Sequence, residues 1–121
     1  MIEKNSKLIS DTQCPVRYVL DRFGDKWFIL VIFELKKVEK LRFNQLQKAI
    51  PDVSQKMLTK TLRNLEADGL VHRTIYPEVP PRVEYNLTKM GISLIPHVCD
   101  LANWDNANFP DIKKAREAYG I

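Results

Sequence analysis

The chain has 121 residues, 45% of them hydrophobic, which is enough for one domain with a modest core and too little for a second. The 19 Lys and Arg exceed the 15 Asp and Glu, giving a net charge of +4 that weakly favours a polyanionic partner. Residues 1–13 are polar and lack the apolar core of a signal peptide, and the longest apolar run, residues 27–33, is too short to cross a bilayer. A cytoplasmic protein without a membrane partner is expected.

Two helices are predicted at the start of the ordered region. Cys14-Pro15 opens the first, because proline is tolerated at the first helical position, and Gly24 ends it. Asp25 can cap the next segment, residues 26–35, which is apolar nearly all round. Its β-branched and aromatic content also allows a strand, but the cap, the length and the neighbouring helices favour a buried helix.

A helix-turn-helix is predicted in the middle of the chain. Residues 41–43 can be briefly extended, and an apolar stripe predicts a helix over residues 44–50. Pro51-Asp52 cannot continue that helix, so the chain must turn before the next one, over residues 54–68. Ser54 is a suitable N-cap for this second helix, and Gly69 is its C-terminal signal.

The second helix of this pair has two different faces. One apolar stripe must face a core; it contains Met57, Leu58, Thr61, Leu62 and Leu65. A turn of 100° per residue places three cations and a hydroxyl on the opposite side, without an acid: Lys56, Thr59, Lys60 and Arg63. Alone, this pattern also describes an ordinary solvated amphipathic helix. The context on both sides favours a face that meets phosphates and base edges.

A hairpin is predicted directly after this helix, because the period changes from 3.6 to 2. The strands are residues 71–76 and 82–87, and the loop between them contains three prolines that stiffen it. Arg73 and Arg82 flank the loop. A helix-turn-helix followed by such a hairpin is a winged helix, an α+β fold that is mostly α, in which the helix can enter a major groove and the wing, residues 76–82, can lie on the backbone or in the minor groove.

The last part of the chain is predicted to be helical. Thr88 can cap a long helix, Pro96 should kink it or mark a late start, and residues 112–119 should form a terminal helix. Apolar faces of the first and last long helices are surplus to a winged-helix core, so we expect them to bury each other across a dimer. The residues concerned are Val16, Val19, Leu20, Phe23, Leu94, Val98, Leu101 and Trp104.

Six segments run in order between residues 14 and 104: Cys14-Pro15-Val16, Gly24-Asp25-Lys26-Trp27, Arg42-Phe43-Asn44-Gln45-Leu46, Ser54-Gln55-Lys56-Met57-Leu58, residues 65–71 and, most specific, the wing over residues 76–85. In these segments the sequence resembles the HxlR-type group of winged-helix transcription regulators, which is related to the MarR regulators. Asp25 stands where many members have a second glycine. The resemblance implies a homodimeric bacterial DNA-binding protein with a dimer made by the N-terminal and last long helices. It divides the chain into a flexible arm (1–13), the winged helix-turn-helix domain with its dimerisation helices (14–106) and a helical tail (107–121).

Eight residues are predicted to contact double-stranded DNA, with an inverted-repeat operator matching the dimer. Five belong to the recognition helix, and three arginines are assigned to the backbone: Gln55, Lys56, Thr59, Lys60, Arg63, Arg42, Arg73 and Arg82. The alternative function is a winged helix that binds another protein without DNA. A protein partner would require apolar or aromatic anchors on the recognition helix, and its outer face has none.

The two cysteines leave a question of sensing open. The resemblance places Cys14 where some members carry a thiol that senses oxidants or electrophiles, and a helix N-terminus favours thiolate. An unreactive cysteine buried at a dimer seam is the alternative. Cys99 is expected to be structural, with a link to Cys14 across the dimer left open.

Catalysis, cofactors and metals are not expected. His97 and Cys99 lack a third ligand at the spacing of a zinc site. The chain also has no nucleophile triad, no glycine-rich phosphate loop and no paired carboxylates on one helical face. A non-enzymatic regulator whose effector, if any, is a small molecule or an oxidant is therefore predicted.

Overall fold

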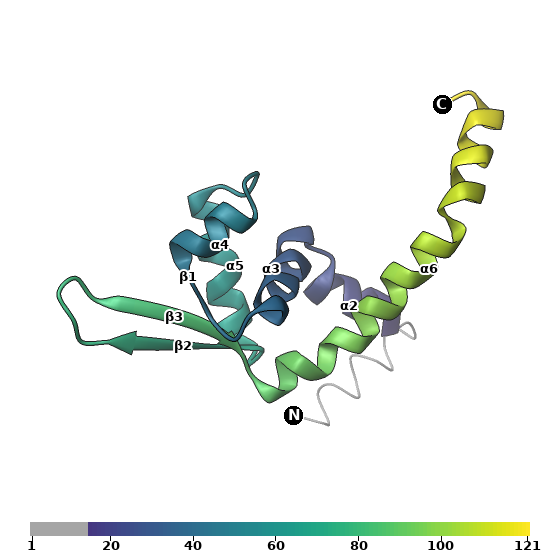
Figure 1. Cartoon of the computed structure of the whole chain (residues 1–121). Coiled ribbons are helices and arrows are strands. Elements are labelled where there is room, and N and C mark those ends of the chain that lie inside the picture. The colour runs from purple at the N-terminus through teal and green to yellow at the C-terminus, as the bar shows by residue number, and fades with distance from the viewer. Residues whose placement is uncertain (1–14) are drawn as a thin grey trace.

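The computed structural model describes residues 15–121 as a helical body with a projecting hairpin and a long final helix (Figure 1). Five helices and three strands follow one another in this part of the chain: α2 (Pro15–Phe23), α3 (Lys26–Lys37), β1 (Leu41–Arg42), α4 (Phe43–Ala49), α5 (Gln55–Ala67), β2 (Val71–Tyr76), β3 (Arg82–Leu87) and α6 (Lys89–Tyr119). The winged-helix fold class predicted from the sequence is confirmed. The arm over residues 1–13 and Cys14 lie outside the described residues.

The helix predicted after Gly24 is confirmed as α3, and the strand alternative is wrong. The Asp25 carboxylate accepts a hydrogen bond from the Trp27 backbone N–H over 2.9 Å, which satisfies one of the unpaired donors at the helix start. Four side chains of α3 are buried in the centre of the core: Phe28, Val31, Ile32 and Leu35. The rings of Phe23 and Phe28 meet edge to face at 5.4 Å, which joins α2 to this core.

The helix-turn-helix is formed by α4 and α5, as predicted. The Ser54 hydroxyl accepts from the Met57 N–H over 3.0 Å, and Gly69 adopts a φ of 76°, a left-handed conformation that suits glycine. Four residues of α5 are buried, namely Leu58, Thr61, Leu62 and Leu65. The apolar stripe thus faces the core, and the basic face of α5 is left in solvent.

The hairpin has the predicted strand boundaries, with β2 and β3 antiparallel. Arg73 lies opposite Tyr85 and Tyr76 lies opposite Arg82. The short extended segment at Leu41 and Arg42 is a true strand that pairs with β3, so the sheet has the order β1-β3-β2. This pairing ties the start of the helix-turn-helix to the wing.

The final helix differs from the prediction. It begins at Lys89, capped by the Thr88 hydroxyl, and runs to Tyr119 through both Pro96 and Pro110. A late start at Pro96 and a separate helix over residues 112–119 are therefore wrong. Ile95 packs in the core and holds the helical turn around Pro96, although proline has no backbone N–H to donate to the preceding turn. Figure 1 shows the second half of α6 extending away from the winged-helix body, with a change of direction along its length.

Candidate nucleic-acid interface

The outer face of α5 brings together all five residues predicted for the recognition helix. Each is exposed, and they line one open concavity: Gln55, Lys56, Thr59, Lys60 and Arg63. Within residues 15–121, none of the three cations forms an ion pair with a carboxylate. The Thr59 hydroxyl donates to the Gln55 carbonyl over 2.9 Å, which leaves its oxygen free to accept. This face offers positive charge and donors that no described acid neutralises.

Arg73 stands beside this face but is already paired. Its Nε lies 3.5 Å from Glu66 Oε1 on α5, and both side chains are partly exposed. Together with Arg63 and Tyr85 they line a notch of about 240 Å³ between α5 and the sheet. Burial raises the pKa of the Tyr85 hydroxyl, so the phenol stays protonated and neutral. The notch is polar, and a DNA backbone running from α5 to the wing would pass over it.

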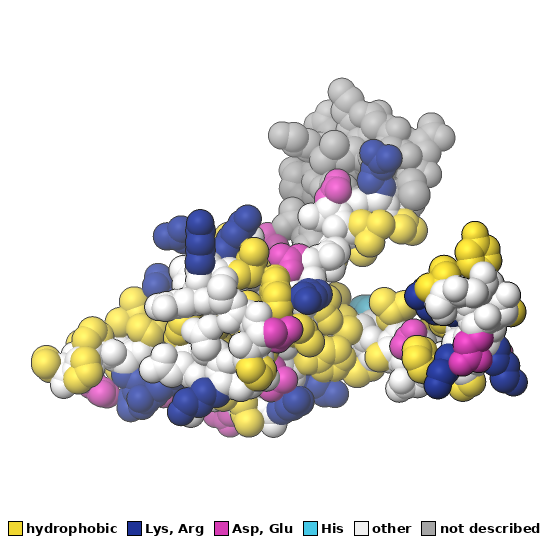
Figure 2. Space-filling view, turned by 90° about the horizontal axis from the view of Figure 1, so that it is seen from above, with side chains coloured by type: hydrophobic (Ala, Val, Ile, Leu, Met, Phe, Trp, Pro, Cys, Tyr) yellow, Lys and Arg dark blue, Asp and Glu magenta, His cyan; other side chains and the backbone are white. Residues whose placement is uncertain are grey.

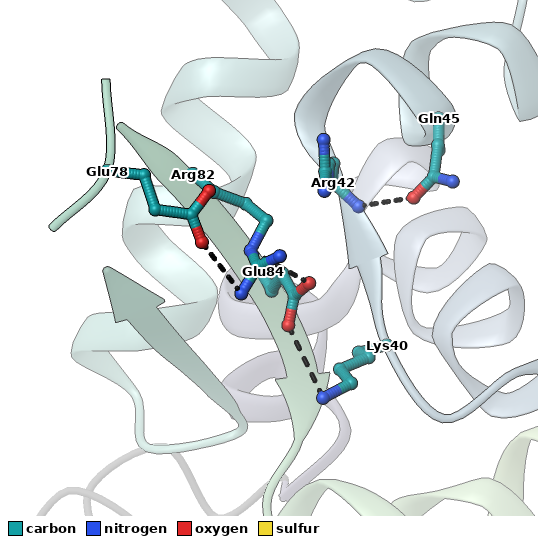
Figure 3. A network of polar contacts seen from close by, with 6 residues as sticks. All are labelled: Lys40, Arg42, Gln45, Glu78, Arg82 and Glu84. Atoms are coloured by element: carbon teal, nitrogen blue, oxygen red, sulfur yellow. Dashed lines mark hydrogen bonds and ion pairs between the residues drawn. The ribbon is translucent and has the colours of Figure 1, made fainter. Parts of the chain in front are cut away.

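Arg82 is held in a network at the base of the wing (Figure 3). Its Nη2 lies 3.1 Å from Glu78 Oε2, and its Nε lies 3.5 Å from Glu84 Oε2. Its guanidinium carbon is also 4.1 Å from the centroid of the Tyr76 ring, a cation–π distance. The positive charge of Arg82, which was predicted to contact the DNA backbone, is therefore already engaged by Glu78, Glu84 and Tyr76 of the same chain.

Lys40 completes this network from the residue before β1. Its ammonium lies 3.4 Å from Glu84 Oε1. Burial alone would raise the pKa of Glu84, but the nearby positive charges of Lys40 and Arg82 outweigh that effect, so the pKa lies below its ordinary value. The same contact with Glu84 raises the pKa of Lys40. The pair joins β3 to the start of the helix-turn-helix.

Lys40, Glu78 and Glu84 were not among the residues predicted for the interface. One signal was present, because Arg82 and Glu84 are two apart in a strand and must share a face. The contacts of Lys40 and Glu78 depend on β1 pairing with β3 and on the shape of the wing loop.

Arg42 lies on β1 beside this network, where its register partner on β3 is Glu84 (Figure 3). Its backbone N–H donates to the Gln45 side chain over 2.8 Å, while its own side chain is exposed. With the loop of the wing it lines a groove of about 490 Å³. Figure 2 shows apolar side chains at the wing end of the molecule, where Val79 is fully exposed, and a group of Lys and Arg side chains projecting from one edge of the body.

The residues predicted for a dimer interface fall into two groups. Five are exposed apolar side chains of α2 and α6, namely Val16, Val19, Leu20, Leu101 and Trp104, and Val98 is partly exposed. Phe23 and Leu94 instead pack against the core of their own chain. Cys99 also packs there, with its Sγ 3.9 Å from the Lys36 ammonium, while Cys14 lies outside the described residues.

Residues 15–121 also bear on metal binding and membrane insertion. No cluster of three or more His, Cys, Asp and Glu gathers there to ligate a metal ion. None of the helices in the same region combines the length and hydropathy needed to cross a membrane.

The fold and the exposed basic helix define a winged helix-turn-helix regulator of transcription. The chain belongs to the HxlR-like helix-turn-helix family, whose model matches residues 22–113. It is 42% identical over 121 residues to the HTH-type transcriptional regulator YybR of Bacillus subtilis (strain 168), covering 100% of this chain and 95% of that protein.

Solved structures agree with this assignment. The redox regulator HypR in its reduced form aligns with a TM-score of 0.76 and 40% identity, covering 84% of this chain and 99% of that chain. The reduced form of the transcriptional regulator YodB from B. subtilis aligns with a TM-score of 0.68 and 33% identity, covering 77% of this chain and 91% of that chain. The resemblance to HxlR-type and MarR-like regulators inferred from the sequence is confirmed.

Proposed function

We propose that this protein is a sequence-specific, double-stranded DNA-binding regulator that acts as a homodimer. The carrying observation is the outer face of α5, where Lys56, Lys60 and Arg63 are exposed and have no acidic partner among the described residues. In this proposal α5 enters the major groove and the wing lies on the backbone or in the minor groove. The same face lacks the apolar anchors that a protein partner would require, which favours DNA over protein recognition.

Dimer formation is supported by the apolar side chains that one copy leaves in solvent. Leu101 and Trp104 on α6 are 70% and 58% exposed, and Val16 and Leu20 on α2 are similarly uncovered. Exposed apolar surface of this extent marks an interaction site. Two copies related by a two-fold axis would present two α5 helices to an inverted-repeat operator.

We also propose that DNA binding responds to oxidants or electrophiles through Cys14. Two structurally similar proteins, HypR and YodB, support this idea, because HypR is named a redox regulator and YodB was also solved after diamide treatment. The test is operator binding before and after diamide or a quinone, in the wild type and in Cys14→Ser. The response should be lost in the variant. Unchanged affinity of a wild type whose Cys14 is demonstrably modified would remove the proposal.

Replacing Lys60 by alanine should weaken binding to operator and random DNA by similar factors. A lysine that contacts a phosphate releases about one counterion, so the slope of log affinity against log salt should fall by about 0.9. Fluorescence anisotropy titrations at several salt concentrations measure both quantities. Lys114→Ala, on the distal part of α6, is the control with the same change of charge.

Two results would contradict this role of Lys60. A loss confined to the operator would mean that the side chain reads a base rather than a phosphate. Equal, small effects of the Lys60 and Lys114 variants would mean that α5 does not face the DNA.

A further inference from the structure

The cations of the candidate interface are of two kinds. Lys56 and Lys60 on α5 are exposed and unpaired among the described residues, whereas Arg82 at the start of β3 is already neutralised by Glu78 and Glu84. A neutralised arginine adds little to the long-range attraction of DNA. A phosphate that binds at its Nη2 must take the place of the Glu78 carboxylate.

The two carboxylates differ in how firmly they are held (Figure 3). Glu84 lies on a paired strand, its side chain is 15% exposed, and it is also bound by Lys40. Glu78 lies in the wing loop, and its side chain is 49% exposed. In the part of the chain that the structure describes, Arg82 is the ion-pair partner of Glu78. Glu78 is therefore the contact that can be exchanged.

Arg82 would keep its position when Glu78 moves away. The Tyr76 ring lies against the guanidinium at 4.1 Å, and Glu84 remains beside Nε at 3.5 Å. Carboxylate and phosphate present oxygens to a guanidinium in the same forked geometry. A DNA phosphate could thus take the place of the Glu78 carboxylate without rearrangement of the strand.

We propose that Glu78 limits the affinity of the wing for DNA, because its carboxylate competes with DNA phosphate for Arg82. This inference rests on the proposed DNA-binding function. On the operator, base contacts of α5 hold the neighbouring phosphate at the wing with a high effective concentration, so the phosphate displaces Glu78. On random DNA that registration is missing, and the tethered carboxylate keeps Arg82. The wing then strengthens operator binding more than non-specific binding.

The test is a double-mutant cycle of Glu78→Gln and Arg82→Gln, measured by fluorescence anisotropy. One probe is a random duplex of about 30 base pairs, close to three helical turns, and the other is the segment footprinted upstream of the protein's own gene. Glu78→Gln should raise affinity for the operator about two- to fivefold, the range of a lost exposed ion pair, because the phosphate there no longer has to displace the carboxylate. The gain on random DNA should be smaller, and with Arg82→Gln in place Glu78→Gln should give no gain on either duplex.

Control variants keep the cycle interpretable. Glu39→Gln removes the same charge from an exposed residue ahead of β1 and should change operator affinity less than Glu78→Gln. Circular dichroism establishes that the Arg82 variant is folded. Arg82→Met, which retains an unbranched chain over Tyr76, provides a second background without charge.

Each other outcome overturns the inference. An equal gain from Glu78→Gln with and without Arg82 would show simple repulsion of DNA by the glutamate. A loss of affinity would show that Glu78 supports the contact, and a gain on random DNA equal to or larger than that on the operator would show that registration by α5 does not drive the exchange. A wild type that binds neither duplex at low salt would instead refute the proposed function, and the inference would fall with it.

Discussion

Replacing Gly91 by alanine is expected to lower the free energy of unfolding by about 2–4 kcal/mol, through overpacking and loss of a helix cap. A Cβ at this position would lie 2.2 Å from the Leu70 carbonyl oxygen and 3.2 Å from the Leu87 side chain. The first distance is far below van der Waals contact with a backbone atom, so α6 must move. Helix propensity predicts the opposite sign, because alanine in a helix is favoured over glycine by about 1 kcal/mol.

The movement is costly because several hydrogen bonds meet at this junction between α5 and α6. The Leu70 carbonyl accepts from the Thr88 N–H over 3.0 Å, and the Thr88 hydroxyl donates to the Gly69 carbonyl over 2.6 Å. The same hydroxyl accepts from the Gly91 N–H over 3.1 Å, which caps α6. Displacement of α6 by a methyl group would strain all of these contacts at once.

Urea unfolding followed by circular dichroism, at one fixed protein concentration, measures the effect. Ser93→Ala is the control in the same turn, since Ser93 is exposed and its hydroxyl donates to the local Met90 carbonyl. It should change stability by less than about 0.5 kcal/mol. An increase in stability for Gly91→Ala would show that α6 does not approach Leu70 this closely.

Local signals were sufficient to predict α3 and α5. In each helix a capping residue, Asp25 or Ser54, precedes a run of apolar residues at helical spacing. Both capping side chains accept the expected backbone hydrogen bonds. The hairpin was likewise predictable from alternation and from the prolines of its loop. These elements are determined by neighbours in sequence, so one chain is enough to place them.

Elements that depend on distant partners were not predictable. β1 has two residues, and its strand character comes from pairing with β3, more than 40 positions later. The path of α6 through Pro96 also contradicts local preference, because burial of Ile95 outweighs the missing backbone hydrogen bond. In both cases tertiary packing decides the local conformation.

The candidate site likewise contains residues that local sequence places and contacts that only tertiary packing decides. The basic face of α5 follows from the helical rotation alone, and the structure places all of its predicted members together. The pairing of Arg73 with Glu66 requires the sheet to lie beside α5, and that of Arg82 with Tyr76 requires the hairpin register. Sequence therefore indicated which cations border the interface but not which of them are already neutralised.

Replacing Leu101 by glutamate is expected to convert the proposed dimer into a folded monomer and to lower operator affinity by at least about 100-fold. The side chain is 70% exposed in one copy, so a charge there leaves the fold of that copy intact. At a dimer seam the same carboxylate would be buried without a partner, at a cost that separates the copies. The second half-site then no longer binds intramolecularly, which removes a gain of about 10²–10⁴.

Sedimentation equilibrium measures the mass, and anisotropy with operator and random duplexes measures binding. Val38→Glu is the matched control, because Val38 is an exposed apolar residue after α3, outside the proposed interface, and should leave mass and affinity unchanged. A Leu101 variant that remains dimeric would place the interface elsewhere on the molecule. A monomer with undiminished operator affinity would show that one α5 and one wing are sufficient for recognition, and the inverted-repeat operator would lose its structural basis.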